Sequence, residues 1–177
     1  MESSIKNYLA LDQSLNITGY AYFTTTPNIK LIGSGTFNIP KTKPIEERLA
    51  AFYKQLTELI KNENIGHIFF EDIQYQNNKD TYKKLAFVQA TILLWCYWNE
   101  IDYTILSPSH WRKVISDNYG IKFGRARAEQ KKSCFNFVTE KWHMSKDNTT
   151  EDEADAIALG MAGLIESRQI NTAKSVW

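Results

Sequence analysis

The sequence contains little cysteine. Cys96 and Cys134 are the only two among 177 residues. Both fall in apolar helical patterns, and neither has the spacing to other ligands that metal sites require. We therefore expect two buried, reduced thiols and a chain that works in a reducing cytoplasm.

Net charge and long apolar runs are nearly absent as well. The 21 basic and 20 acidic residues leave a formal charge of +1 at pH 7, so any nucleic-acid-binding surface must be local. Residues 1–7 lack the apolar run of a signal peptide. The most apolar segment, 85–98, is interrupted by Gln89 and Thr91 and is shorter than the ~20 residues that cross a bilayer. We expect no membrane association.

What is present fits one globular domain. Hydrophobic residues make up 43% of the chain and charged residues 23%, which is ordinary for a folded domain with one sizeable core. No internal repeat or low-complexity tract divides the sequence. We expect residues 1–177 to form a single domain.

Short apolar segments separated by turn residues predict five strands, at 8–12, 20–23, 31–39, 67–71 and 103–106. The first three follow one another closely, which indicates an antiparallel meander. The strand at 67–71 comes after a helix, so we expect it to lie parallel in the same sheet. This pattern predicts an α/β fold with a five-stranded mixed sheet flanked by helices.

Helical periodicity predicts five helices, near residues 45–61, 81–98, 111–115, 126–141 and 150–167. The loop around 118–125 is expected to be flexible because it contains two glycines. The helix at 81–98 is apolar almost all round, so we expect it to be buried on more than one side. Either it is a central core helix, or part of its surface meets a second subunit; the sequence leaves both interpretations open.

Two predicted strands end in a carboxylate. Asp12 ends the first strand and Glu71 ends the strand at 67–71. A charge at the rim of a core is costly unless it is paired, although a single strand-end Asp is more often only a turn starter. If the two strands are neighbours, Asp12 and Glu71 lie on the same edge of the sheet.

A third acidic group opens the last predicted helix. Thr150 and Glu153 form a capping-box pattern, which explains the early acids by helix capping. Capping explains Asp155 less well, because this residue lies where the helix becomes apolar. Asp152 and Asp155 share one face, with Cβ atoms roughly 5–6 Å apart. The alanines beside Asp155 allow that face to approach another element closely.

If this helix approaches the sheet edge, four carboxylates converge, and such a group needs cations. All-oxygen ligands without a nearby His or Cys favour Mg²⁺ or Mn²⁺. Two ions about 3.5–4 Å apart would clamp the attacking and leaving oxygens of a phosphodiester. The candidate catalytic and metal-binding residues are Asp12, Glu71, Asp152 and Asp155, with two ions per site and no organic cofactor.

Residues 112–132 are locally basic, with seven cations against Asp117 and Glu129. A basic run is usually only a solvated face. Beside a glycine-containing loop, this one favours contacts with phosphates. The candidate phosphate-contacting residues, which become candidate DNA-binding residues if the partner is DNA, are Arg112, Lys113, Lys122, Arg125, Arg127, Lys131 and Lys132.

Five motifs together resemble the RuvC family of Holliday junction resolvases, within the RNase H-like superfamily. They occupy residues 11–14 with 18–21, then 70–74, 107–113, 127–132 and 151–157. The motifs occur in family order over residues 8 to 165, and the likeness is to the branch found in phages and low-GC Gram-positive bacteria.

The resemblance implies an RNase H-like fold and a crossover junction endodeoxyribonuclease that serves DNA recombination and repair in a bacterial or phage-infected cell. It implies that Asp12, Glu71, Asp152 and Asp155 form the metal-binding catalytic tetrad. It also implies a homodimer, formed partly through the helix at 81–98, that makes paired nicks in two strands of a four-way junction.

In the family, an aromatic residue in the loop after the glutamate touches bases. Tyr75 is the nearest candidate, one position later than the family pattern. Lys79 and Lys83 complete the candidate DNA contacts. His143 lies outside the motifs, and we interpret it as structural.

Three alternatives stay open at this point. A junction-binding protein without nuclease activity would be favoured by a missing acid, and none is missing. An actin-like kinase or ATPase would need a second glycine-containing phosphate loop, whereas Gly33 and Gly35 stand in a strand pattern. A nuclease of the same fold acting on structured RNA is compatible with the same two-ion chemistry.

Overall fold

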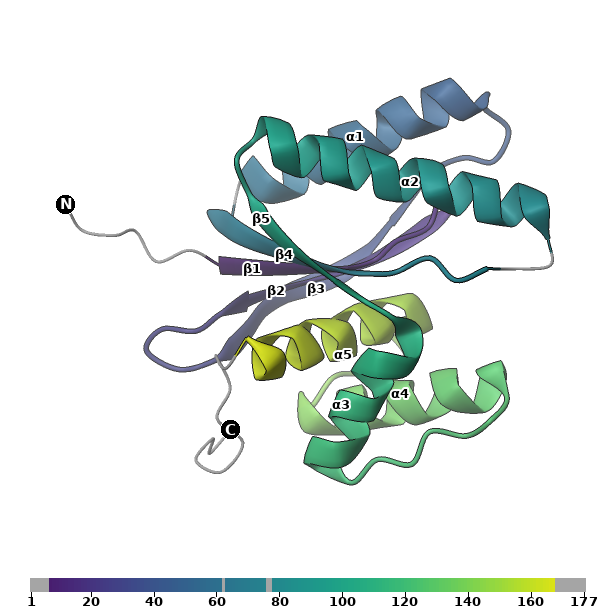
Figure 1. Ribbon diagram of the computed structural model, residues 1–177. Helices are drawn as coiled ribbons and strands as arrows, with labels where there is room; N and C mark the ends of the chain where they lie inside the picture. Colours follow the sequence, from purple (N-terminus) through teal and green to yellow (C-terminus); the bar gives the residue numbers. More distant parts are fainter. Residues whose placement is uncertain (1–6, 62, 76–77, 168–177) are drawn as a thin grey trace.

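The computed structural model describes residues 7–61, 63–75 and 78–167. Its centre is a five-stranded sheet with the order β3-β2-β1-β4-β5 (Figure 1). The first three strands form an antiparallel meander, whereas β4 pairs in parallel with both β1 and β5. The predicted mixed sheet is therefore confirmed. The strands are β1 Asn7–Asp12, β2 Ile17–Thr24, β3 Lys30–Asn38, β4 Ile65–Glu71 and β5 Asp102–Leu106.

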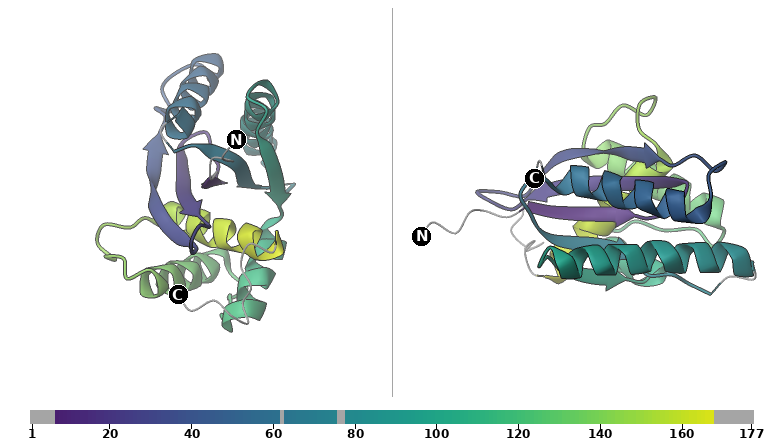
Figure 2. Two further views of the ribbon diagram at one scale, coloured as in Figure 1. Left: turned by 90° about the vertical axis from the view of Figure 1, so that its left-hand side faces the viewer. Right: turned by 90° about the horizontal axis from the view of Figure 1, so that it is seen from above.

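Helices cover both faces of the sheet (Figure 1). One face carries α1 (Ile45–Lys61) and α2 (Lys79–Trp98), and the other carries α5 (Glu151–Glu166). On the outer side of α5 lie α3 (Pro108–Tyr119) and α4 (Arg127–Lys141), so this side has two layers of helix (Figure 2). Of the helices in the described part of the chain, none is long and apolar enough to cross a bilayer.

Alternation along β1 divides the core between the two faces. Leu9 and Leu11 pack toward α1 and α2, while Ala10 between them packs toward α5. The two cysteines are free and buried, as expected. Cys96 lies in the core between the sheet and α1 and α2, and Cys134 lies in the core on the α5 side of the sheet.

The helix α5 lies close to the sheet because its sequence is small and apolar. Every residue from 153 to 164 is buried. A Cβ at Gly160 would lie 2.8 Å from the Cβ of Ala10 and 2.4 Å from the ring of Phe23. Glycine at this position therefore permits the close approach of α5 to β1 and β2.

The helix α3 is longer than predicted. It begins at Pro108, a residue suited to the first helical turn. It ends at Gly120, whose φ of 70° lies in the left-handed region that favours a glycine cap. Asn118 and Tyr119, which were expected in a flexible loop, are helical, because the ring of Tyr119 packs on Phe137 at 5.2 Å between centroids.

Candidate active site

Two carboxylates lie at one edge of the sheet because β1 and β4 are parallel neighbours. Leu11 of β1 pairs with Phe70 of β4, and each strand ends at the next residue, Asp12 or Glu71. Leu11 and Phe70 are fully buried, so the two carboxylates stand where the core meets solvent. The register places Asp12 and Glu71 side by side, as the sequence predicts.

The start of α5 brings Asp152 and Asp155 to the same edge. The β2 residue opposite Asp12 is Gly19. A Cβ at Gly19 would lie 1.9 Å from the carbonyl oxygen of Asp152. Any side chain at this position would push the helix away, so Gly19 allows the first turn of α5 to touch the sheet beside Asp12.

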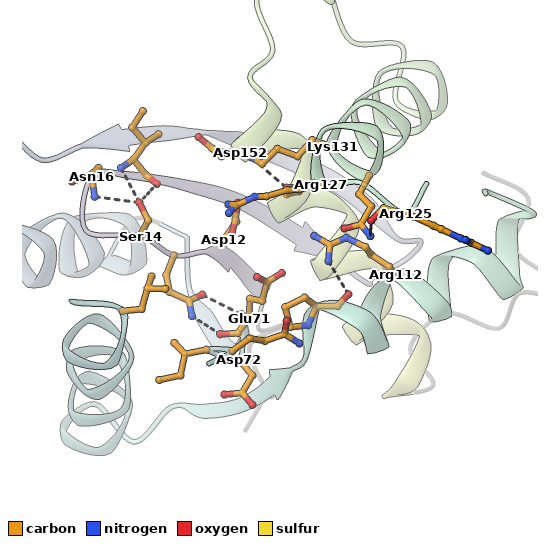
Figure 3. Close-up of a pocket in the computed structure, with 18 of the residues that line it drawn as sticks. Asp12, Ser14, Asn16, Glu71, Asp72, Arg112, Arg125, Arg127, Lys131 and Asp152 are labelled. Carbon is orange, nitrogen blue, oxygen red and sulfur yellow. Dashed lines mark hydrogen bonds and ion pairs between the residues drawn. The ribbon is translucent and has the colours of Figure 1, made fainter. Parts of the chain in front are cut away.

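All four carboxylates line one cleft of about 500 Å³. Figure 3 shows three of them, Asp12, Glu71 and Asp152, around this cleft. Five basic side chains line it as well, and Lys41 contributes from the segment before α1. Arg112 comes from α3, Arg125 from the loop before α4, and Arg127 and Lys131 from α4. The cleft crosses the sheet edge from these helices to α2, where Leu85 forms part of its wall.

The ionised forms of these carboxylates are destabilised by burial and by one another's negative charge. Burial raises the pKa of Asp12 well above its usual range, and the negative charges of Glu71, Asp155 and Asp152 raise it further, against the Lys131 ammonium, which lowers it. Burial is also the main cause of the raised pKa values of Glu71 and Asp155. The group is therefore close enough for mutual repulsion, and a cation would relieve it.

Lys131 supplies one such cation. Its Nζ lies 2.8 Å from Oδ1 of Asp152, 3.7 Å from Oδ2 of Asp155 and 4.0 Å from Oε2 of Glu151. Burial alone would lower the pKa of Lys131, but the hydrogen bond to Asp152 and the surrounding carboxylates outweigh burial and raise it. Among the described residues, no three Asp, Glu, His or Cys side chains lie close enough together to hold one ion. A bound metal ion would compete with Lys131 for Asp152 and Asp155.

Glu71 is held from two sides by residues to which the sequence analysis assigned no role. The indole Nε1 of fully buried Trp111 donates to Oε2 of Glu71 at 2.7 Å. The amide of Gln13 pairs with the Glu71 backbone: Nε2 donates to the carbonyl oxygen, and Oε1 accepts the N–H at 3.1 Å. The Trp111 ring also carries the Arg112 guanidinium, with Cζ 4.4 Å from the ring centroid. The sequence signal was only their place inside the motifs at 11–14 and 107–113.

The raised pKa of Asp12 predicts a stability change. In EDTA at pH 7, Asp12→Asn should raise the melting temperature. Because the folded pKa lies above the unfolded value of about 3.9, the stability contributed by this group is complete below that pH and is lost as the pH rises through the folded pKa. Asparagine removes the charge, so the gain should vanish as the pH falls to about 4.

Thermal unfolding in EDTA across this pH range measures the effect, and each kcal/mol should appear as about 2–4 °C. Glu58→Gln on the exposed face of α1 is the matched control, and it should show no gain. An Asp12→Asn variant whose melting temperature follows the wild type at every pH would contradict the repulsion.

The predicted DNA contacts separate into two groups. Arg112, Arg125, Arg127 and Lys131 line the cleft. Among the described residues, the remaining candidates do not line it: Tyr75, Lys79, Lys83, Lys113, Lys122 and Lys132. Tyr75, in the loop after β4, is 77% exposed, and its ring lies 5.9 Å from that of Tyr82.

Known proteins are similar to this chain in sequence and in fold. The family model for crossover junction endodeoxyribonuclease RuvC matches residues 8–163. RuvC of Ehrlichia canis is 26% identical over 155 residues, which cover 88% of this chain and 94% of the relative. RuvC of Brachyspira hyodysenteriae is 25% identical over 167 residues, covering 94% of this chain and 98% of the relative.

Solved structures show the same fold. RuvC of T. thermophilus in complex with a Holliday junction substrate has a TM-score of 0.73 at 10% identity and covers 92% of this chain and 95% of its own. The yeast mitochondrial Holliday junction resolvase has a TM-score of 0.68 at 14% identity, covering 93% and 80%. The predicted RNase H-like fold is confirmed, whereas the branch within the family stays a prediction. Because the family model matches from β1 into α5, this chain belongs to the RuvC family of crossover junction endodeoxyribonucleases.

Proposed function

We propose that this protein is a metal-dependent endonuclease that resolves Holliday junctions and related branched DNA by paired nicks. One observation carries the proposal: the cleft brings Asp12, Glu71, Asp152 and Asp155 together with five basic side chains. Carboxylates suit divalent ions, and basic side chains suit the phosphates of a strand. Membership of the RuvC family supports the substrate class, and such an enzyme serves DNA recombination and repair.

The donor set fits hard divalent ions. The acidic lining of the cleft consists of carboxylates, and within the described residues no His or Cys lines it. Metal dependence is consistent with the family. We propose two Mg²⁺ or Mn²⁺ ions held by Asp12, Glu71, Asp152 and Asp155. When bound, such ions lower the pKa of an attacking water and stabilise the leaving 3′-oxygen.

The chain's own residues divide the remaining work. Trp111 orients one oxygen of Glu71, and Arg112, stacked on Trp111, faces the cleft where a phosphate would lie. Arg125 and Arg127 extend the positive wall along the path of a strand. Tyr75 is exposed enough to stack on a base at the branch point.

We also propose a homodimer formed through α2. Its outer face exposes Phe87, Leu94, Tyr97 and Trp98, and the last three are 58%, 74% and 72% exposed. The opposite face, which includes Ile92, is buried against the sheet and α1. An apolar cluster left in solvent is typical of an interaction surface, and a second copy would bring a second active site to the other strand of a junction.

We propose that one domain of residues 1–177 carries these functions and acts in the cytoplasm. Two free buried thiols support the reducing location.

Cleavage of an end-labelled four-way junction tests the proposed function. Linear duplex, fork and structured RNA of matched length are tested in parallel as substrates, each in Mg²⁺ and in EDTA. Symmetric nicks in the junction that require the metal and spare the duplex are expected. Preferred cutting of RNA would favour the alternative nuclease, and junction binding without cutting in any metal would contradict the proposal.

Trp111→Phe is expected to raise the Mg²⁺ concentration for half-maximal cleavage by about 10- to 100-fold, the usual effect of losing a partner that orients a metal ligand. Phenylalanine keeps an aromatic ring in the core but cannot donate to Glu71.

Trp95→Phe is the matched control, because Trp95 is also buried and does not line the cleft. Its indole N–H donates a hydrogen bond to Oγ1 of Thr57 at 2.9 Å. Both variants should lose similar stability, while only Trp111→Phe should change the metal requirement. Equal metal requirements for the two variants would show that Trp111 is merely structural.

A further inference from the structure

A second pocket of about 280 Å³ adjoins the cleft on the α1–α2 side of the sheet. Its walls are the turn at 14–16 between β1 and β2, Lys41 from the segment before α1, Arg48 from α1, and Lys84 from α2. Ser14, Asn16 and Lys41 line both hollows, so the pocket lies directly beside the cleft.

Arg48 is the unusual residue of this pocket. It is a charged residue of the amphipathic helix α1, yet its side chain is only 6% exposed. Its Nη2 donates to the Leu15 carbonyl at 3.0 Å and to Oδ1 of Asn16 at 2.5 Å, and its Nε is buried without a hydrogen-bond partner. Within the described residues, no carboxylate pairs with it. A permanently charged guanidinium buried with neutral partners leaves an anion as the missing counter-charge.

The other charges of the pocket have the same sign. Lys41 is exposed at the rim, and Lys84 lines the wall while its Nζ bonds Asp80 one turn earlier. No Asp or Glu of the described chain lines this pocket, in contrast with the acidic centre of the cleft. Three cations with hydroxyl and amide groups suit phosphate oxygens and exclude a metal ion.

We propose that the pocket of Lys41, Arg48 and Lys84 binds a backbone phosphate of the strand that passes through the cleft. The proposal rests on the proposed function and adds a second anchoring point to it. Asp12 and Asn16 are four residues apart, so their Cα atoms lie at most about 14 Å apart. Neighbouring phosphates of one strand are ~3.4 Å apart along a duplex axis and further apart along the strand itself, so the anchored phosphate lies within about four phosphates of the one that is cut.

The first test uses the two lysines at the rim, because Arg48 belongs to the core. Lys41→Gln with Lys84→Gln should weaken junction binding and lower the slope of log K against log salt by about one to two, at ~0.9 per phosphate contact. The matched control is Lys43→Gln with Lys54→Gln, two lysines that form exposed i,i+4 pairs with Glu47 and Glu58. It should keep the wild-type slope. A Lys41/Lys84 variant with the wild-type slope would overturn the proposal.

The second test identifies the phosphate. Single uncharged methylphosphonate linkages are placed at each of the four positions on either side of the cut in one strand. One position is expected to weaken wild-type binding about tenfold, the size of a lost charge-assisted contact, and to have little effect in the Lys41→Gln/Lys84→Gln variant. Equal responses of both proteins at every position would overturn the proposal that this pocket binds a phosphate. Metal-dependent nicking by the wild type in the same experiment would leave the proposed function intact. A wild type that neither binds nor cuts the junction would overturn the proposed function itself.

Discussion

Asp155→Asn is expected to slow junction cleavage by at least about a thousandfold while junction binding is kept. Asp155 is 5% exposed and lines the cleft beside Lys131. Asparagine has nearly the same shape, so α5 still packs on the sheet, but the negative charge that would hold an ion is gone. Metal ions contribute several kcal/mol to the transition state, and each 1.36 kcal/mol is a factor of ten in rate.

Binding should survive because the basic wall is untouched. Arg112, Arg125 and Arg127 belong to other elements, and removal of one acid reduces repulsion of the phosphates. Glu151→Gln is the matched control on the same helix, since Glu151 is exposed and does not line the cleft. Single-turnover rates and junction dissociation constants should be measured for both variants. An Asp155→Asn rate within about tenfold of the wild type would contradict the assignment.

A charge on the outer face of α2 is expected to dissociate the proposed dimer and to convert paired nicks into single ones. Leu94→Glu combined with Trp98→Glu should give a particle of 20.5 kDa rather than twice that mass. Each lost apolar side chain costs about 1.5–3 kcal/mol, and an unpaired buried charge costs more. The dimer dissociation constant should therefore rise by more than about a thousandfold.

Sedimentation velocity measures the mass, and a junction labelled on both cut strands reports whether nicks occur in pairs. Ile32→Glu on β3 is the control, because Ile32 is also an exposed apolar residue, 44% exposed, but lies away from α2. It should stay dimeric. A wild type that sediments as a monomer at all concentrations would contradict the proposed interface.

The sequence predicted the parts of the site that depend on backbone topology. Asp12 and Glu71 were expected on one sheet edge because apolar strands run directly into them, and a strand after a crossover helix pairs in parallel. The alanines beside Asp155 allowed a close approach of Asp152 and Asp155 to that edge, and the resemblance to the RuvC family implied it. Both features are local patterns joined by a rule of strand topology, and such patterns are visible in one sequence.

The contacts that refine the site were not predictable in this way. Lys131 looked like six other cations of its segment, and only the packing of α4 on α5 selects it as the partner of Asp152. Trp111 followed an apolar helical pattern, which says nothing of where its indole N–H points. Arg48 is one charged residue of an amphipathic helix, and its burial depends on the turn after β1. These are side-chain contacts over long separations in sequence, set by tertiary packing.

The central claim is that the four carboxylates form a metal site, and a crystal of the wild-type protein grown with Mn²⁺ at neutral pH tests it most directly. An anomalous difference map is expected to show two peaks about 3.5–4 Å apart among Asp12, Glu71, Asp152 and Asp155, with the Lys131 ammonium displaced from Asp152. A map without peaks there, in which Lys131 keeps its 2.8 Å contact with Asp152, would contradict the account.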